Sequence, residues 1–361
     1  MDDSGGPVER RPTGGGARGI LARVPRQSAV PSLPVRVLGT GAHRPSRVVL
    51  SSELDTAHGR DAGTSEARSG VRSRRWASAE ETSSVMAAAA VRQALDAAGL
   101  DVGDLDAVVV SAVAPEQPMP TTAVLTAAHL GVPGGRVAAL DVNASCVGFL
   151  SALDLASAAV AVGRWERVAV VATEIASKGL DHREVEGSAL FGDGAAAVVV
   201  GAAAPDDGSA VLASASGVWP DARSACRIDA GGTRFNVTTP PDDPSAYLFR
   251  MDGAALLRQV ARHLPGFLRD LERRAGLGVD EVDVVVPHQA SAVGLRYLRE
   301  RVGVQPDAVV DILADHGNQV SASVPTALHH AVTSGRLRRG QTALLLGTGA
   351  GLALSATMLR Y

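Results

Sequence analysis

Cys146 is one of two cysteines in the 361-residue chain, and it lies in the stretch DVNASCVGF at residues 141–149. An apolar run precedes it and an alanine-rich run follows it, so we expect the thiol at a strand-to-helix turn. The dipole of the following helix favours a thiolate there, which predicts a lowered thiol pKa and a nucleophile. The alternative is an inert buried cysteine, which is common in protein cores.

Two further polar residues follow apolar runs later in the chain. His288 lies in VVVPHQAS and Asn318 lies in DHGNQVSASVP. An imidazole beside a nucleophile can hold a proton or stabilise an anion, and a carboxamide can donate a hydrogen bond to an oxyanion. Each residue also has a structural alternative, which is a hydrogen-bonded turn histidine in the first case and an asparagine that caps a helix in the second.

An internal repeat relates the two parts of the chain. GLDVGDLDAVV at residues 99–109 and GLGVDEVDVVV at residues 276–286 are identical at six of eleven positions. The segments that begin at Cys146 and Asn318 also align. Two matches in the same order indicate two copies of one α/β unit, residues 34–205 and residues 206–361.

The repeat has a chemical consequence. It places Cys146 and Asn318 at the same strand-to-helix turn of the two copies, and it places His288 just past a strand. Equivalent turns converge near the axis when two copies are related by a pseudo-twofold. We therefore expect these three side chains to meet in one site.

Buried strands and helices alternate along the chain. TSSVMAAAAVRQALDAAG predicts a helix that Ser83 or Ser84 caps and Gly99 ends. Continuous apolar strands between helices indicate sheets that are covered on both faces. The predicted strands are VRVLG, AVVVSA, RVAALD, RVAVVATE and AAAVVVG.

Composition excludes several classes of protein. A net charge of −3 and 3% aromatic residues argue against nucleic acid or an anionic membrane as the partner. Two separated cysteines predict no disulfide framework, no metal site and a reduced, cytoplasmic location. Residues 1–33 contain six Gly, four Pro and five Arg and no aromatic residue, which predicts a disordered N-terminal tail.

Five motifs resemble those of the β-ketoacyl-acyl carrier protein synthase III family of condensing enzymes. They are DVNASCVGF, LFGDGAAAVVV, VPHQAS, HGNQVSASVP and GTGAGLALSATMLRY, and they occur in the family's order over about residues 35–361. The resemblance implies an α/β, thiolase-like fold. In this fold two related α/β halves form an αβαβα layered sandwich with pseudo-twofold symmetry.

The resemblance also implies roles for the polar residues. Cys146 would take an acyl group from a thioester, and the backbone N–H groups of Cys146 and Ala350 would form an oxyanion hole. His288 and Asn318 would stabilise the enolate that forms when a malonyl thioester loses carbon dioxide. The substrates would be acyl-coenzyme A or acyl-carrier-protein thioesters, with no cofactor.

Further implied sites concern substrates and partners. Arg68 and Phe191 would contact substrate. Met119 would enter the acyl pocket of the partner in a homodimer, where a Phe is usual, although ordinary packing near a surface turn is the alternative. Arg258 and Arg262 lie at i and i+4 of a helix and would dock an acidic acyl carrier protein, unless they form only a solvated helix face.

The chain departs from the family where coenzyme A binds. The adenine-stacking Trp is absent, as are a second stacking Arg and two Asn residues, and the positions concerned hold Thr64, Val185 or Glu186, Ser291 and Ala254. These losses favour a carrier protein as the acyl donor. Two functions stay open: decarboxylative condensation, which retention of Asn318 favours, and acyl transfer to an alcohol or amine.

Overall fold

The computed structural model describes residues 32–361, so most of the predicted tail at residues 1–33 lies outside the described residues. The last residue of that segment, Leu33, is described. It exchanges two backbone hydrogen bonds with Val211, of 2.8 and 2.9 Å.

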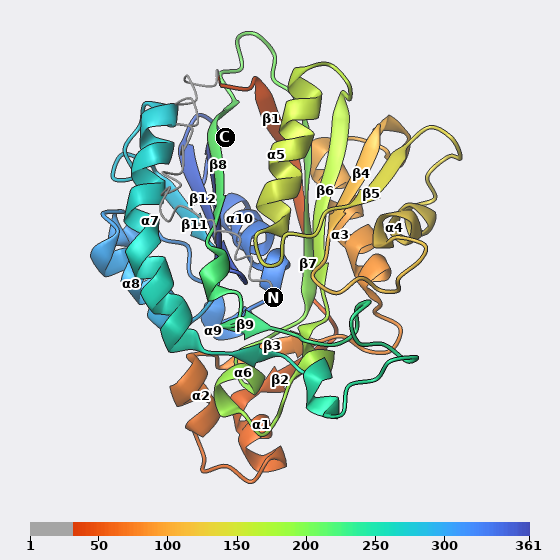
Figure 1. The fold of residues 1–361 in the computed structure, drawn as a ribbon. Coiled ribbons are helices and arrows are strands. Elements are labelled where there is room, and N and C mark those ends of the chain that lie inside the picture. Colours follow the sequence, from red (N-terminus) through yellow and green to blue (C-terminus); the bar gives the residue numbers. More distant parts are fainter. Residues whose placement is uncertain (1–31) are drawn as a thin grey trace, which may run out of the picture. The chain divides into compact units, whose positions relative to one another are not determined.

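Two mixed sheets form the framework (Figure 1). The first has the strand order β1-β7-β6-β4-β5, in which β4 is parallel to β5 and β6, and β7 is antiparallel to β1 and β6. Its strands are β1 (Val35–His43), β4 (Ala107–Ser111), β5 (Ala138–Asp141), β6 (Arg167–Glu174) and β7 (Gly194–Ala202). The strands that the sequence predicts are all present in this sheet.

The second sheet repeats the connections of the first. Its order is β8-β13-β12-β11, with β11 parallel to β12 and β13 antiparallel to both of its neighbours. A parallel bridge between Val285 and Val309 occupies the position that β5 has in the first sheet. The strands are β8 (Ala210–Val218), β11 (Val284–Pro287), β12 (Thr342–Gly349) and β13 (Ala353–Arg360). The predicted boundary at 205/206 lies in the connection between β7 and β8.

Helices form three layers around the sheets (Figure 1). Helices α5 and α10 lie between the two sheets, α3 and α4 cover the outer face of the first, and α7 and α8 cover the outer face of the second. Three buried apolar clusters fill the spaces between these layers, which confirms the predicted αβαβα arrangement. The bounds are α3 (Ser83–Ala98), α4 (Thr122–Leu130), α5 (Gly148–Ala161), α7 (Gly253–Ala275), α8 (Ala292–Arg301) and α10 (Ser323–Thr333).

Shorter elements gather at one end of the sheets (Figure 1). They are β2 (Arg47–Leu50), β3 (Ser73–Trp76), β9 (Cys226–Arg227), β10 (Arg250–Met251), α1 (Ser51–Ala57), α2 (Thr64–Ser69), α6 (Val185–Ser188) and α9 (Leu313–His316). Short 3₁₀ turns join the rest, at Val102–Asp104, Ala176–Gly179, Pro220–Ala222, Pro244–Tyr247, Pro306–Ala308 and Val320–Ala322. Within residues 32–361 no helix combines the length and apolar character that crossing a membrane requires.

The predicted helix over residues 82–99 forms as α3, with one difference at its start. Gly99 ends it in the left-handed region at φ 66°, as expected. The predicted cap by Ser83 or Ser84 is wrong, because the N-cap residue is Thr82. A carboxylate oxygen of Glu116 accepts from the backbone N–H of Ser84 at 2.8 Å instead, so a residue distant in sequence satisfies this helix end.

Close packing of β1 on α3 yields a stability prediction. A Cβ atom at Gly41 would overlap the carbonyl oxygen of Ala90, so Gly41→Ala is expected to lower the free energy of unfolding by about 1–3 kcal/mol. Urea unfolding measures the effect. Gly134→Ala is the matched control, because its Cβ would meet no heavy atom within 4 Å. Equal stability of the two variants would contradict the close approach.

Candidate active site

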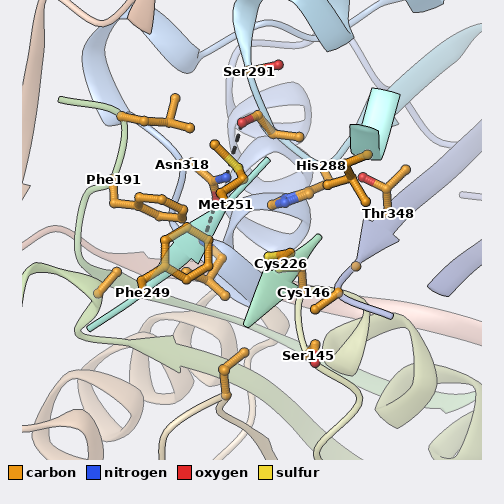
Figure 2. A pocket seen from close by; sticks show the side chains of 18 of the residues that line it. Ser145, Cys146, Phe191, Cys226, Phe249, Met251, His288, Ser291, Asn318 and Thr348 are labelled. Carbon is orange, nitrogen blue, oxygen red and sulfur yellow. Dashed lines mark hydrogen bonds between the residues drawn. The ribbon is translucent and has the colours of Figure 1, made fainter. Parts of the chain in front are cut away.

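A cavity of about 1200 Å³ lies between elements of the two halves of the chain. Figure 2 shows side chains from both halves around it. Predicted site residues that line the cavity are Arg68, Cys146, Phe191, His288, Asn318 and Ala350. Met119, Arg258 and Arg262 do not line it. The structure thus brings together the three residues that the repeat relates.

A tight turn presents Cys146 two residues before α5. Ser145, the preceding residue, has φ 52°, which is uncommon for a residue other than glycine. The Oδ1 atom of Asn143 accepts from the N–H of Ser145 at 3.0 Å and stabilises this conformation. At Gly148 a Cβ atom would overlap the hydroxyl of Ser111, so only glycine lets α5 begin this close to the end of β4.

The thiol of Cys146 is protonated in the free protein. Burial raises its pKa, and Cys226 and Glu174 raise it further, while the N–H groups of Ala350 and of Cys146 act in the opposite direction. The predicted lowering of this pKa is therefore wrong, because loss of water outweighs the favourable dipoles. The same two N–H groups are the pair that the predicted oxyanion hole requires.

His288 follows β11 and is 5% exposed. Its backbone N–H donates to Leu346 at 2.7 Å, and the buried side chain of Gln289 donates to Pro287 and Val310 at 2.9 and 3.1 Å. Burial lowers the pKa of His288 to about 4, so the imidazole is neutral at pH 7. Its Nδ1 atom has no hydrogen-bond partner among residues 32–361. A neutral imidazole of this kind can accept a proton or donate a hydrogen bond.

The Asn318 side chain is fixed on both sides of its amide. Its Nδ2 atom donates to the carbonyl of Ala290 at 3.2 Å, and its Oδ1 atom accepts from the N–H of Val320 at 2.8 Å. These two bonds set the amide orientation and leave one N–H free. Asn318 is not the N-cap residue of α10, which is Ala322, but its side chain binds the N–H of the first residue in the 3₁₀ turn that precedes α10.

The other predicted site residues, Phe191, Arg68 and Met119, differ in how far they are buried. The ring of Phe191 is buried and packs edge-on against Phe249, with the ring centroids 4.9 Å apart. Arg68 lies on α2 and is exposed where it meets the cavity. Met119 is 84% exposed, so its side chain contributes little to the packing of its own chain.

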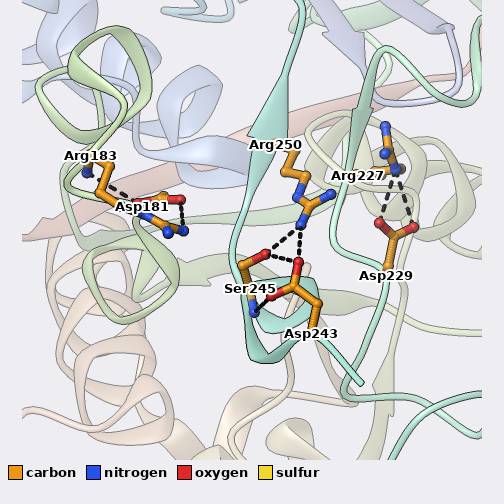
Figure 3. A network of polar contacts seen from close by, with 7 residues as sticks. All are labelled: Asp181, Arg183, Arg227, Asp229, Asp243, Ser245 and Arg250. Carbon is orange, nitrogen blue, oxygen red and sulfur yellow. Dashed lines mark hydrogen bonds and ion pairs between the residues drawn. The ribbon is translucent and has the colours of Figure 1, made fainter. Parts of the chain in front are cut away.

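Polar contacts support the cavity wall around β9 and β10, which contributes Ile228 and Tyr247 (Figure 3). Surface ion pairs are individually worth about 0–1 kcal/mol, so several are needed to fix a segment with few apolar neighbours. The pairs are Arg227 with Asp229 at 3.0 Å, Arg250 with Asp243 at 3.3 Å, and Arg183 with Asp181 at 2.6 Å.

Sequence reasoning missed three residues at the cavity: Asn143, Glu174 and Cys226. Glu174 had a detectable signal, since a carboxyl group ends an otherwise apolar strand in RVAVVATE. Asn143 and Cys226 gave no such signal, because their places depend on how loops fold. Among residues 32–361 no group of three or more His, Cys, Asp or Glu side chains is placed to hold a metal ion.

Comparison with known proteins connects this site to a family. Residues 140–218 match 3-oxoacyl-[acyl-carrier-protein] synthase III, and residues 273–361 match the C-terminal part of the same enzyme. An acetoacetyl CoA synthase from Streptomyces is 33% identical over 326 residues, which are 90% of this chain and 98% of that protein. A beta-ketoacyl-[acyl-carrier-protein] synthase III from Neisseria meningitidis is 33% identical over 333 residues, which are 90% of this chain and 99% of that protein.

Solved structures agree in fold. The 3-oxoacyl-[acyl-carrier-protein] synthase III of Aquifex aeolicus is 30% identical with a TM-score of 0.81, covering 91% of this chain and all of that one. The priming β-ketosynthase of the R1128 polyketide pathway is 34% identical with a TM-score of 0.82, covering 92% and 98%. The chain belongs to the 3-oxoacyl-[acyl-carrier-protein] synthase III family of thiolase-fold acyltransferases. The predicted family, fold class and condensing-enzyme class are thereby confirmed.

Cys146→Ala is expected to abolish covalent loading of an acyl group and to leave the fold intact, because the small side chain fits the same turn. Intact-protein mass spectrometry after incubation with acyl thioesters measures loading. Cys226→Ala is the matched control, since this second thiol lines the same cavity and should not carry the acyl group. An acyl group found on Cys226 of the wild-type protein or of Cys146→Ala would contradict the assignment.

Proposed function

We propose that the protein loads an acyl group on Cys146 and condenses it with a malonyl thioester. The observation that supports this is the single cavity in which a thiol, a neutral imidazole and a fixed carboxamide are brought together from both halves of the chain. Acyl and malonyl thioesters are the substrates, and the proposal requires no cofactor.

In the first step, Sγ of Cys146 attacks the thioester carbonyl. The N–H groups of Cys146 and Ala350 bind the oxygen as it becomes negative. The thiol proton passes to the departing sulfur, and the neutral imidazole of His288 can carry it because burial keeps this ring unprotonated at pH 7. The products are the acyl-cysteine and the free thiol of the donor.

In the second step, the malonyl thioester loses carbon dioxide and becomes an enolate. His288 and Asn318 donate hydrogen bonds to the enolate oxygen. The enolate carbon attacks the acyl-cysteine carbonyl, and Cys146 leaves as a thiolate that then takes a proton from water. One donor at an oxyanion contributes about 2.7–4 kcal/mol, so the two residues are expected to dominate this step.

Asn318→Ala is expected to slow malonyl decarboxylation by about 10²–10³-fold, because one oxyanion donor is lost. Acylation of Cys146, followed by mass, should change far less. Release of carbon dioxide from labelled malonyl thioester is the measurement, and His288→Ala is expected to behave similarly. Decarboxylation by Asn318→Ala at the wild-type rate would favour the alternative function, acyl transfer to an alcohol or amine without condensation.

The walls of the cavity support a carrier protein as the donor. Ser291 and Ala254 occupy the positions of the two absent Asn residues. The hydroxyl of Ser291 accepts from the N–H of Gly294 at 3.1 Å and so caps α8, and the side chain of Ala254 is only a methyl group. Trp76 does not line the cavity; the guanidinium of Arg47 lies 5.4 Å from its ring centroid. Trp76 therefore does not take the place of the absent stacking Trp at the cavity, whereas a carrier brings its own docking surface.

Helix α7 joins the cavity to an exposed basic surface. Leu256 and Leu257 line the cavity, while Arg258 and Arg262 on the same helix are exposed. An acidic carrier docked on these arginines would have its prosthetic arm beside the cavity. The exposed Met119 supports a homodimer in which this residue contacts the partner subunit, and a cytoplasmic location stays a prediction.

Arg258→Glu combined with Arg262→Glu is expected to reduce acylation by an acyl carrier protein and to spare acylation by a short pantetheine thioester. The preference for the carrier should also weaken with salt, since exposed charges are screened beyond about 8–10 Å at physiological ionic strength.

The matched control is Arg269→Glu combined with Arg273→Glu, which changes the same charges at the same spacing about 16 Å further along α7. Initial acylation rates from mass spectrometry compare the variants. Equal loss in both double variants would contradict docking at Arg258 and Arg262.

A further inference from the structure

Glu174 is a buried acid that the reaction above does not use. It is the last residue of β6, is 4% exposed and lines the cavity. Among residues 32–361 it takes part in no ion pair. A buried carboxyl group without a cation is costly when ionised, so its presence beside the nucleophile calls for a role.

Three donors converge on one oxygen of this carboxyl group. Its Oε1 atom accepts from the backbone N–H of Val113 at 3.1 Å, from the backbone N–H of Ser321 at 3.3 Å, and from the hydroxyl of Ser321. The Oε2 atom accepts only from the N–H of Val113, at 3.2 Å, and this N–H also contacts Oε1. Oε1 therefore acts as a carbonyl oxygen, and Oε2 is the atom left to carry a proton.

Both donor residues connect to the catalytic turns. The carbonyl of Val113 accepts from Asn143 at 3.1 Å, and Asn143 in turn accepts from the N–H of Ser145, next to the nucleophile. On the other side, Val320 immediately precedes the serine that the carboxyl binds, and its N–H is bound by Asn318. One carboxyl group thus links the cysteine turn of the first half to the asparagine turn of the second.

We propose that Glu174 is a positioning residue that acts in its protonated form, linking the turns of Cys146 and Asn318 without bringing a negative charge to the cavity. The neutral form matters because the malonyl substrate is itself a carboxylate. An ionised Glu174 would repel that substrate and would also oppose formation of the Cys146 thiolate. The kinetic part of this inference rests on the proposed condensation.

The electrostatics of the surroundings support the neutral form. Burial raises the pKa of Glu174 to about 8, against hydrogen bonds from Ser321 and Val113 that lower it, and the charge of Asp193 raises it further. The thiol of Cys146 feels the charge of Glu174, and its own pKa is raised. His288, on the same cavity, is neutral above about pH 4. Glu174 is therefore expected to ionise between pH 7 and 9, where these other groups keep their charge state.

The test compares the wild-type protein with Glu174→Gln, whose amide reproduces the acceptor and donor of a protonated carboxyl group. In the wild type, the KM for malonyl thioester should rise about tenfold from pH 7 to pH 9, as the binding-competent fraction falls to roughly one in eleven. In Glu174→Gln the KM should stay level over this range, with kcat at pH 7 close to that of the wild type. Glu174→Ala, which cannot link the turns, should lose most of kcat at every pH.

Glu186→Gln is the control, because it removes a different carboxyl group at the same cavity. This variant should keep the alkaline rise in KM. Arg68, Lys178 and Arg227 also line the cavity and are common to all variants, so their charges cancel in the comparison. A level KM in the wild type, an alkaline rise that persists in Glu174→Gln, or a loss of kcat in Glu174→Gln equal to that in Glu174→Ala would each overturn the proposal.

A substrate-free readout separates this inference from the proposed function. The folded pKa of Glu174 lies above its ordinary value of 4.5, so its contribution to stability is complete below pH 4.5 and is lost as the pH rises to about 8. The free energy of unfolding of Glu174→Gln, relative to the wild type, should therefore increase over this interval. A constant difference would show that the carboxyl is ionised throughout and would overturn the inference even if condensation is confirmed. If the difference in the free energy of unfolding changes with pH as expected but the protein shows no malonyl activity, only the proposed function is rejected.

Discussion

Desolvation of the reacting groups between the two halves governs the chemistry of this site. Burial is the largest cause of the raised pKa values of Cys146 and Glu174 and of the lowered pKa of His288. All three groups are consequently neutral at pH 7. These three groups bring no negative charge to the cavity before substrate enters or reacts, and in such an environment each N–H donor is worth more than it would be in water.

This environment requires two copies of the α/β unit, because neither encloses the site alone. The first sheet and α5 place Cys146, while the second sheet and the turn before α10 place His288 and Asn318. Backbone hydrogen bonds of 2.9 and 3.0 Å join Asn318 to Leu190 and Gly192, which belong to the first half. The contact between halves thus runs through the site itself, and shifting one half against the other would change the reacting geometry.

The fold and the three residues Cys146, His288 and Asn318 could be predicted from the sequence, because both depend on repeated local patterns. Strand and helix periods mark the layers, and the repeat aligns Cys146 with Asn318. The raised pKa of the Cys146 thiol could not be predicted from the sequence. The helix dipole follows from local sequence, whereas burial depends on residues that are distant in the chain. The prediction of the α3 cap failed for the same reason, because Glu116, which binds the first turn of α3, comes from another segment of the chain.

The distribution of charge separates the reaction inside the cavity from the recognition of the acyl donor at the surface. At the reacting centre, Cys146, Glu174 and His288 are neutral, so the chemistry there depends on hydrogen-bond geometry. Outside, the exposed Arg258 and Arg262 on α7 can attract an acidic carrier through long-range fields without altering the cavity, because solvent screens them from it. The same helix supplies Leu256 and Leu257 to the cavity wall, so the proposed docking on its basic face would place a carrier near the cavity. If the proposed docking holds, donor choice can change through surface residues while the neutral reacting groups Cys146, Glu174 and His288 stay fixed.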